Sequence, residues 1–356
     1  MSWLAAPTRY AALSPASARV ALAALGLLVA ACVGLTLTAP APPPDTVAAP
    51  TTASDDRADV RLYETVIARV RSGEPYYPAA AASLRTGNYP LKPFVTFRLP
   101  TLAWIEAHLP RTATILLVYA LAAGTFAAWA ARLAPAFTRT PPSLIAGALV
   151  LAGLARFVQA DLVVFHEVWA SLLVALSLAL RRPGRWLASV AVALAAVLIR
   201  ETAALYVVVM AGTALAEGQR REAIAWGGVL AVLVLVIALH AQAVAGVVLP
   251  SDPASPGWSG MHGPGLFVSS VVAATGLSLL PAALAAALVA LAVFGWGGWR
   301  DPMAIRVLGL LAAYALLIGA AARPDTWYWA LFAAVPLIPG LAFAPDGLRD
   351  LVRRAA

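Results

Sequence analysis

Apolar residues form long runs over most of this chain, and short charged connectors separate the runs. A helix of about twenty apolar residues can cross a bilayer, because it satisfies its own backbone hydrogen bonds there. The pattern therefore predicts an all-α polytopic membrane protein with about ten transmembrane helices. The runs lie at about residues 18–39, 111–133, 143–160, 163–180, 186–199, 202–216, 223–248, 278–296, 303–321 and 328–345.

The connectors between these runs differ in charge, and arginines gather in every second one. By the positive-inside rule, the arginine-rich connectors and both termini lie on the cytoplasmic side. The expected segments are a cytoplasmic N-terminus at 1–17, the first transmembrane helix at 18–39, an extracytoplasmic loop at 40–110, a helical bundle at 111–345 and a cytoplasmic C-terminus at 346–356.

Residues 186–216 lie between two basic connectors but carry Arg200 and Glu201 in the middle. A single span would leave this pair of charges at the centre of the bilayer, which is energetically expensive. Two short helices folded as a hairpin keep both connectors on one side and bring the pair towards the other. We therefore predict a hairpin.

Residues 55–77, DDRADVRLYETVIARVRSGEPYY, form the longest charged stretch of the chain. Val60, Tyr63, Val66 and Val70 recur at helical spacing, which predicts an amphipathic helix on the outer membrane surface that ends near Gly73. A second short helix is expected at 78–85, and residues 99–108 lead into the second span.

Composition agrees with a membrane protein, since 62% of the residues are hydrophobic and 12% are charged. A soluble domain has roughly twice that share of charged residues. The net charge of +8 comes mainly from the connectors, so orientation in the bilayer explains it better than nucleic acid binding. The single cysteine excludes an internal disulfide, and the four scattered histidines give no metal motif. We expect no metal and no cofactor.

The predicted topology gathers most of the remaining polar residues on the outer face. Charged groups at membrane depth are candidates for function when they meet at one cavity, although they can also pair with one another as structural contacts. The group outside the first loop is Arg156, Asp161, His166, Glu167, Arg200, Glu201, Asp252, His262, Arg323, Asp325 and Tyr328.

Asp59 allows two interpretations. It stands near the expected start of the surface helix, where a carboxylate caps free backbone N–H groups, and Asp55 and Asp56 compete for that position. A carboxylate aimed into a cavity can also serve as a general base. The two roles are compatible with each other.

Asp59-x-x-x-Tyr63 followed by Gly73-Glu74-Pro75-Tyr76 resembles the start of the first outer loop in GT-C superfold glycosyltransferases, most closely the mannosyltransferase-like and arabinosyltransferase-like enzymes. The motif is loose and covers about twenty residues. The resemblance implies a multi-pass enzyme of the plasma membrane (the bacterial inner membrane) with an extracytoplasmic site. It also implies a polyprenyl-phosphate sugar donor, a glycan, lipid or protein acceptor, and Asp59 as general base. Many members carry adjacent acidic residues at the base, which leaves Asp55 and Asp56 as alternatives.

Such a reaction needs a base, cations for the leaving phosphate, and an apolar groove for the lipid. With Asp59 as the single base, direct displacement would invert the anomeric centre. The expected phosphate-binding cations are Arg61, Arg98, His166, Arg200 and Arg323, since the arginine fork matches phosphate. The other expected substrate contacts are Tyr76, Tyr77, Glu167, Glu201 and Asp325.

Two other classes of protein fit part of the pattern. A lipid or sugar transporter, such as a flippase, would also carry embedded Arg/Glu groups and interrupted helices along its substrate path. The long outer loop and the lack of repeated halves speak against it. A membrane scaffold, in which the embedded charges only pair, is the third interpretation.

Overall fold

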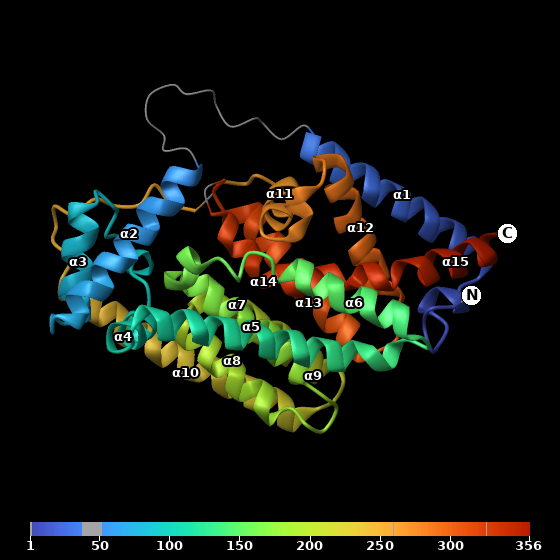
Figure 1. The fold of residues 1–356 in the computed structure, drawn as a ribbon, viewed down its shortest axis with the longest axis horizontal. Coiled ribbons are helices and arrows are strands. Elements are labelled where there is room, and N and C mark those ends of the chain that lie inside the picture. Colours follow the sequence, from blue (N-terminus) through green and yellow to red (C-terminus); the bar gives the residue numbers. More distant parts are fainter. Residues whose placement is uncertain (1, 38–51, 259, 325) are drawn as a thin grey trace.

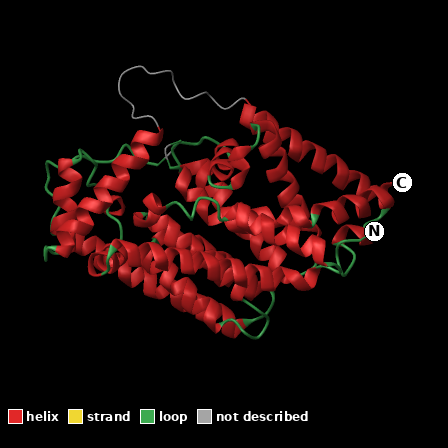
Figure 2. Cartoon of the chain, in the orientation of Figure 1, coloured by secondary structure: helices red, strands yellow, loops and turns green. Residues whose placement is uncertain are grey.

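The computed structural model describes residues 2–37, 52–258, 260–324 and 326–356, and this part of the chain folds into helices joined by loops (Figure 1; Figure 2). No strand occurs in these ranges, so the all-α prediction is confirmed. The helices are α1 Pro15–Leu37, α2 Thr52–Arg71, α3 Tyr76–Thr86, α4 Pro100–His108, α5 Arg111–Leu133, α6 Thr140–Gly153, α7 His166–Leu180, α8 Leu187–Ile199, α9 Ala204–Ala216, α10 Arg220–Ala245, α11 Pro264–Ala273, α12 Ala282–Gly298, α13 Pro302–Ala321, α14 Leu331–Leu337 and α15 Ala344–Ala355.

Within the described ranges, four helices are long and apolar enough to cross a membrane: α1, α5, α10 and α13. A fifth candidate is the bent pair formed by Trp327–Ala342 and α15, whose axes differ by 51°. Helices α1, α5, α10 and α13 match the predicted runs at 18–39, 111–133, 223–248 and 303–321, and Trp327–Ala342 matches the run at 328–345. The chain therefore has the helices of a membrane protein.

The other predicted spans are shorter apolar helices, α6, α7, α8, α9 and α12, of 13 to 17 residues. At about 1.5 Å per residue they reach roughly 20–26 Å, less than the roughly 30 Å of a hydrocarbon core. The total of ten spans stays a prediction. Helix α11 was missed: it follows the Pro/Gly-rich loop 249–263, and its ten residues are too short to register as an apolar run. Helix α15 occupies most of the segment 346–356, for which only a cytoplasmic C-terminus was expected.

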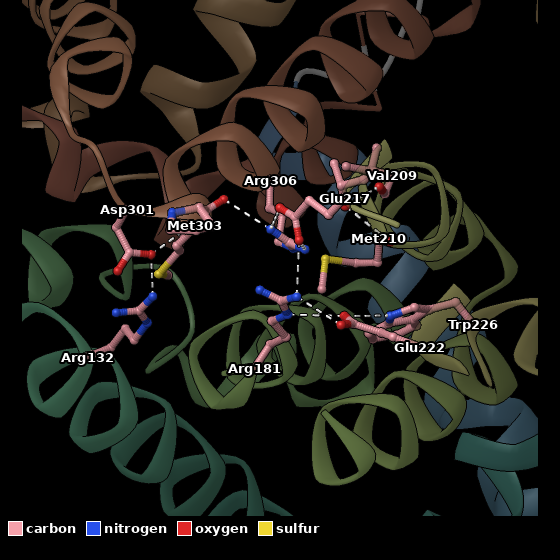
Figure 3. A network of polar contacts seen from close by, with 12 residues as sticks. Arg132, Arg181, Val209, Met210, Glu217, Glu222, Trp226, Asp301, Met303 and Arg306 are labelled. Atoms are coloured by element: carbon pink, nitrogen blue, oxygen red, sulfur yellow. Dashed lines mark hydrogen bonds and ion pairs between the residues drawn. The ribbon is translucent and has the colours of Figure 1, made fainter. Parts of the chain in front are cut away.

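The hairpin predicted at 186–216 is confirmed. Helix α8 ends at Ile199 and α9 begins at Ala204. At the far ends of the two helices, Arg181 pairs with Glu222 at 2.8 Å and with Glu217 at 3.4 Å, so both basic connectors meet (Figure 3).

Further contacts gather the other basic connectors at this end of the bundle. Arg306 contacts Glu217 at 2.7 Å, and Arg132 pairs with Asp301 (Figure 3). Asp346 accepts hydrogen bonds from the backbone N–H groups of Trp3 and Leu4 at 2.8 and 2.7 Å, so both termini lie together. Figure 1 shows the termini at one end of the molecule and α2, α3 and α4 at the other. We call these the connector end and the loop end.

The first helix packs against the last part of the chain. Tyr10 stacks on Phe294 with 4.8 Å between ring centroids, and its hydroxyl donates to the Phe294 carbonyl at 2.8 Å. Ala18 of α1 shares a buried cluster with Phe294 and Leu351. Helices α1, α12 and α15 thus form one packed unit.

Surface helices α2 and α3 occur where the sequence predicts them, and α2 ends two residues before Gly73, which has a positive φ of 97°. Two arginines fix these helices to the rest of the chain. Arg71 donates to the carbonyls of Glu106 and Ala107 at 2.7 and 3.1 Å, which ties α2 to α4. Arg85 of α3 forms a two-pronged contact with Asp252, at 2.8 and 2.7 Å.

Candidate functional site

A cavity of about 450 Å³ lies at the loop end of the bundle. Its walls come from α2, α3 and α4 on one side, and from helix ends and breaks of the bundle on the other. The polar residues that line it are Asp59, Tyr63, Tyr76, Tyr89, Thr96, Arg98, Glu106, His166, Arg200, Glu201, Thr202, Ser255, Arg323, Thr326 and Tyr328. Segments far apart in the sequence therefore supply one site.

Asp59 lies in the interior of α2, because the helix begins at Thr52. The interpretation of Asp59 as an N-cap is therefore wrong. Its carboxylate lines the cavity and accepts a hydrogen bond from the Tyr89 hydroxyl at 3.0 Å. The side chains of Asp55 and Asp56 lie outside the described part of the chain.

An ion-pair network supports the floor of the cavity. Glu167 has 0% of its side chain exposed and contacts Arg200 at 2.7 Å and Arg98 at 3.7 Å. Arg200 also pairs with Glu201. Because Glu167 lies behind the lining, it holds the two guanidinium groups in place and does not itself face the cavity.

Tyrosines hold Arg98 from the surface helices. Its Nε donates to the Tyr63 hydroxyl at 3.1 Å, and the Tyr76 hydroxyl donates to the Arg98 carbonyl at 2.7 Å. Burial raises the pKa of both tyrosines, that of Tyr63 to about 12, so their hydroxyls stay protonated at neutral pH. Tyr63 and Tyr76 thus position a cation at the cavity wall.

Eight of the predicted site residues meet at this cavity: Asp59, Tyr76, Arg98, His166, Arg200, Glu201 and Arg323 in the lining and Glu167 directly behind it. Asp325 lies outside the described residues. The remaining two, Arg61 and Tyr77, do not line the cavity.

The structure does not place Arg61 and Tyr77 at the cavity, although both were predicted to contact the substrate. Arg61 is exposed and faces a shallow groove on the outer side of α2, because two residues after Asp59 is about 200° around the helix. The ring of Tyr77 packs edge-to-face on that of Tyr76, with 5.2 Å between centroids, but Tyr77 does not line the cavity, and its hydroxyl lies 3.1 Å from His240 Nδ1. His240 therefore serves as a contact between α10 and α3.

Glu106 is the main residue that the sequence analysis missed. It is 4% exposed, lines the cavity, and its Oε1 has no hydrogen-bond partner among the described residues. The spacing of Leu102, Ala103, Glu106 and Ala107 places Glu106 on the buried face of α4, and this was the available signal. The short helix α4 was not recognised as a separate element because the long apolar run at 111–133 follows it directly.

Unpartnered polar atoms concentrate at this cavity. Besides Glu106 Oε1, they include His166 Nδ1 and the hydroxyl oxygens of Thr96 and Thr202, again within the described residues. A buried polar atom without a partner costs free energy, so several of them around one cavity indicate a site for a polar ligand.

Glu106 makes stability depend on pH. Burial raises the pKa of its carboxyl from 4.5 to about 8, against the opposing charges of Arg111 and Arg71. Between these values the folded protein retains a proton that the unfolded chain has lost, so stability should fall as pH rises through this window. Unfolding of the detergent-solubilised protein, followed from about pH 5 to 9, should show this decline, and Glu106→Gln should flatten it. Glu74→Gln, at a half-buried pair with Arg69, is the control and should leave the decline intact.

No group of three His, Cys, Asp or Glu residues in the described ranges is arranged to hold a metal ion. The arrangement is three arginines, of which Arg200 is buried and the other two are half-buried, together with a carboxylate around a part-apolar cavity. Comparison with known proteins finds no family model, no curated protein and no solved structure that matches this chain.

Proposed function

We propose that this protein is a membrane glycosyltransferase, which moves a sugar from a polyprenyl-phosphate donor to an acceptor at the loop end, with Asp59 as general base. The observation that carries the proposal is the single cavity lined by Asp59 together with Arg98, Arg200 and Arg323. A base and a set of phosphate-binding cations are the two charged components that this transfer needs.

The arginines suit the leaving phosphate. Glu167 holds Arg98 and Arg200 from behind, which fixes them before the substrate arrives. A guanidinium group offers paired N–H donors that match phosphate oxygens and does not lose its charge. Groups held in place before the reaction stabilise developing charge without reorganising.

The apolar part of the lining suits a lipid donor. Side chains from the surface helices and the bundle leave apolar surface beside the charged groups: Leu62, Val66, Ile67, Leu84, Leu102, Val164, Trp258 and Leu317. An isoprenoid chain can pack along such a surface while its phosphate contacts the arginines, which is the division expected of a site with a few placed polar groups.

The reaction follows from this placement. Asp59 removes the proton from the acceptor hydroxyl, and the oxygen forms a bond to the anomeric carbon of the donor. The bond from that carbon to the phosphate oxygen breaks, and the polyprenyl phosphate leaves with its negative charge against the arginines. One displacement with one base inverts the anomeric centre.

The test uses the full chain in proteoliposomes with a panel of polyprenyl-phosphate sugars and candidate acceptors. The expected result is release of polyprenyl phosphate together with formation of a glycosylated acceptor of inverted configuration. Movement of an intact lipid-linked sugar across the bilayer without cleavage would support a transporter instead. If no donor of the panel is cleaved or moved across the bilayer, the result contradicts both functions.

A further inference from the structure

A second, larger pocket lies at the connector end of the bundle. It has a volume of about 1030 Å³ and opens between the two basic connectors, with Ala128 and Ala131 of α5 as one wall. Helix α7 separates it from the cavity described above, because His166 at the start of α7 lines the cavity and Leu180 at its end lines this pocket. We call it the connector pocket.

The acidic residues near the connector pocket are already paired. Arg181 contacts Glu222 and Glu217, and Arg306 takes both oxygens of Glu217 at 2.7 Å (Figure 3). Figure 3 shows these carboxylates turned towards Arg181 and Arg306. The negative charge of these carboxylates is therefore already neutralised by arginines of the bundle.

Four other arginines line the same pocket, two from each connector: Arg182, Arg185, Arg220 and Arg221. Within the part of the chain described, none of them lies within ion-pair distance of a carboxylate. Arg182 donates to the carbonyls of Ala179 and Arg181, which fixes it at the end of α7. Burial lowers the pKa of Arg182, and the charge of Arg132 lowers it further against the opposing charge of Asp301.

Apart from Gln219 and Glu222, which is paired with Arg181, the rest of the lining consists of glycines and apolar residues. Leu187 is 72% exposed, and Leu180 and half-buried Trp186 lie beside it. Tryptophan is enriched where acyl chains meet headgroups, and a basic pocket between helices next to apolar surface matches an anionic head on a lipid tail. A water-soluble anion would leave the apolar wall unused.

We propose that the connector pocket binds the headgroup of an anionic phospholipid, with a preference for a lipid that carries two phosphates. Each connector contributes two arginines, so one phosphate can lie against each connector. The acyl chains extend along Leu180 and Leu187. This site does not depend on the function proposed for the cavity.

The experiment measures lipid binding to the purified full chain by native mass spectrometry, with diphosphatidylglycerol, phosphatidylglycerol and phosphatidylcholine as probes. The expected order of affinity is the order of their charge, with diphosphatidylglycerol first. The double variant Arg185→Gln/Arg221→Gln removes one exposed arginine from each connector and should weaken diphosphatidylglycerol binding about tenfold or more, since each basic residue near a membrane surface contributes on the order of a fivefold factor.

The matched control is Arg353→Gln/Arg354→Gln, which removes two exposed arginines from the same end but outside the pocket. It should change the affinity less than about twofold. Equal losses in both double variants would overturn the proposal, because the binding would then be general attraction to a basic surface. Equal competition by inorganic pyrophosphate would also overturn it, in favour of a soluble anion. Both double variants should unfold at the same temperature as the unchanged protein in a zwitterionic micelle, which excludes misfolding as the cause of weaker lipid binding.

Discussion

Asp59→Asn is expected to reduce sugar transfer by about 10²–10⁴-fold, the contribution typical of a general base, while donor binding and folding persist. Asparagine keeps the shape of the side chain and can still accept the hydrogen bond from the Tyr89 hydroxyl, but it cannot take the acceptor's proton. The variant leaves unchanged the arginines that we propose to bind the phosphate. The measurement is single-turnover transfer beside equilibrium binding of the donor, so that loss of the chemical step is separated from loss of binding.

The matched control is Asp161→Asn, which changes an exposed carboxylate outside the cavity lining and should leave transfer unchanged. Asp55→Asn and Asp56→Asn test the alternatives that the family resemblance leaves open. An unchanged rate of sugar transfer by Asp59→Asn would contradict the assignment of Asp59 as the general base. A large loss in Asp55→Asn, Asp56→Asn or Glu106→Gln would then identify its replacement.

Glu167→Gln is expected to lower the free energy of unfolding by about 3–5 kcal/mol, the cost of breaking a buried ion pair by removing one partner. Glu167 is fully buried and is the carboxylate shared by Arg98 and Arg200. Without its charge, Glu201 becomes the remaining partner of Arg200 in the described network. Reversible unfolding in a fixed mixed micelle, followed by denaturant titration, measures the difference.

The control for this prediction is Glu64→Gln, which breaks a solvent-exposed pair with Arg111 and should have little effect on unfolding. The double variant Glu167→Leu/Arg200→Met should recover only part of the loss, since it removes the charge of Arg200 but leaves that of Arg98. A loss for Glu167→Gln no larger than that for Glu64→Gln would contradict the assignment of Glu167 as the support of the cavity floor.

The large-scale arrangement could be predicted because it depends on long, repeated signals. Apolar runs place the long helices, and the arginines of the connectors identify which connectors share an end. The contact of Arg181 with Glu217 and Glu222 confirms the hairpin that the charges at Arg200 and Glu201 predict. These signals involve many residues, so a single irregular position does not obscure them.

The details of the candidate site depend on helix phase and on exact helix starts, which short segments specify poorly. Arg61 is two residues from Asp59 and faces the opposite side of α2. The early start of α2 at Thr52 removes Asp59 from the N-cap. Glu106 was missed because its short helix α4 precedes a long apolar span. Burial of a charged side chain depends on what packs over it, and the local sequence does not show this.

The packing of α1 has a consequence for the order in which the protein is made. The ribosome makes α1 well before the segments that carry Phe294, Ala344 and Leu351, against which α1 packs. Until those segments are made α1 lacks these packing partners, and its nearly uniform apolar sequence suits lipid surroundings. The α1, α12 and α15 unit can close only after α15 has been made, so this packing is a late step relative to the synthesis of α1.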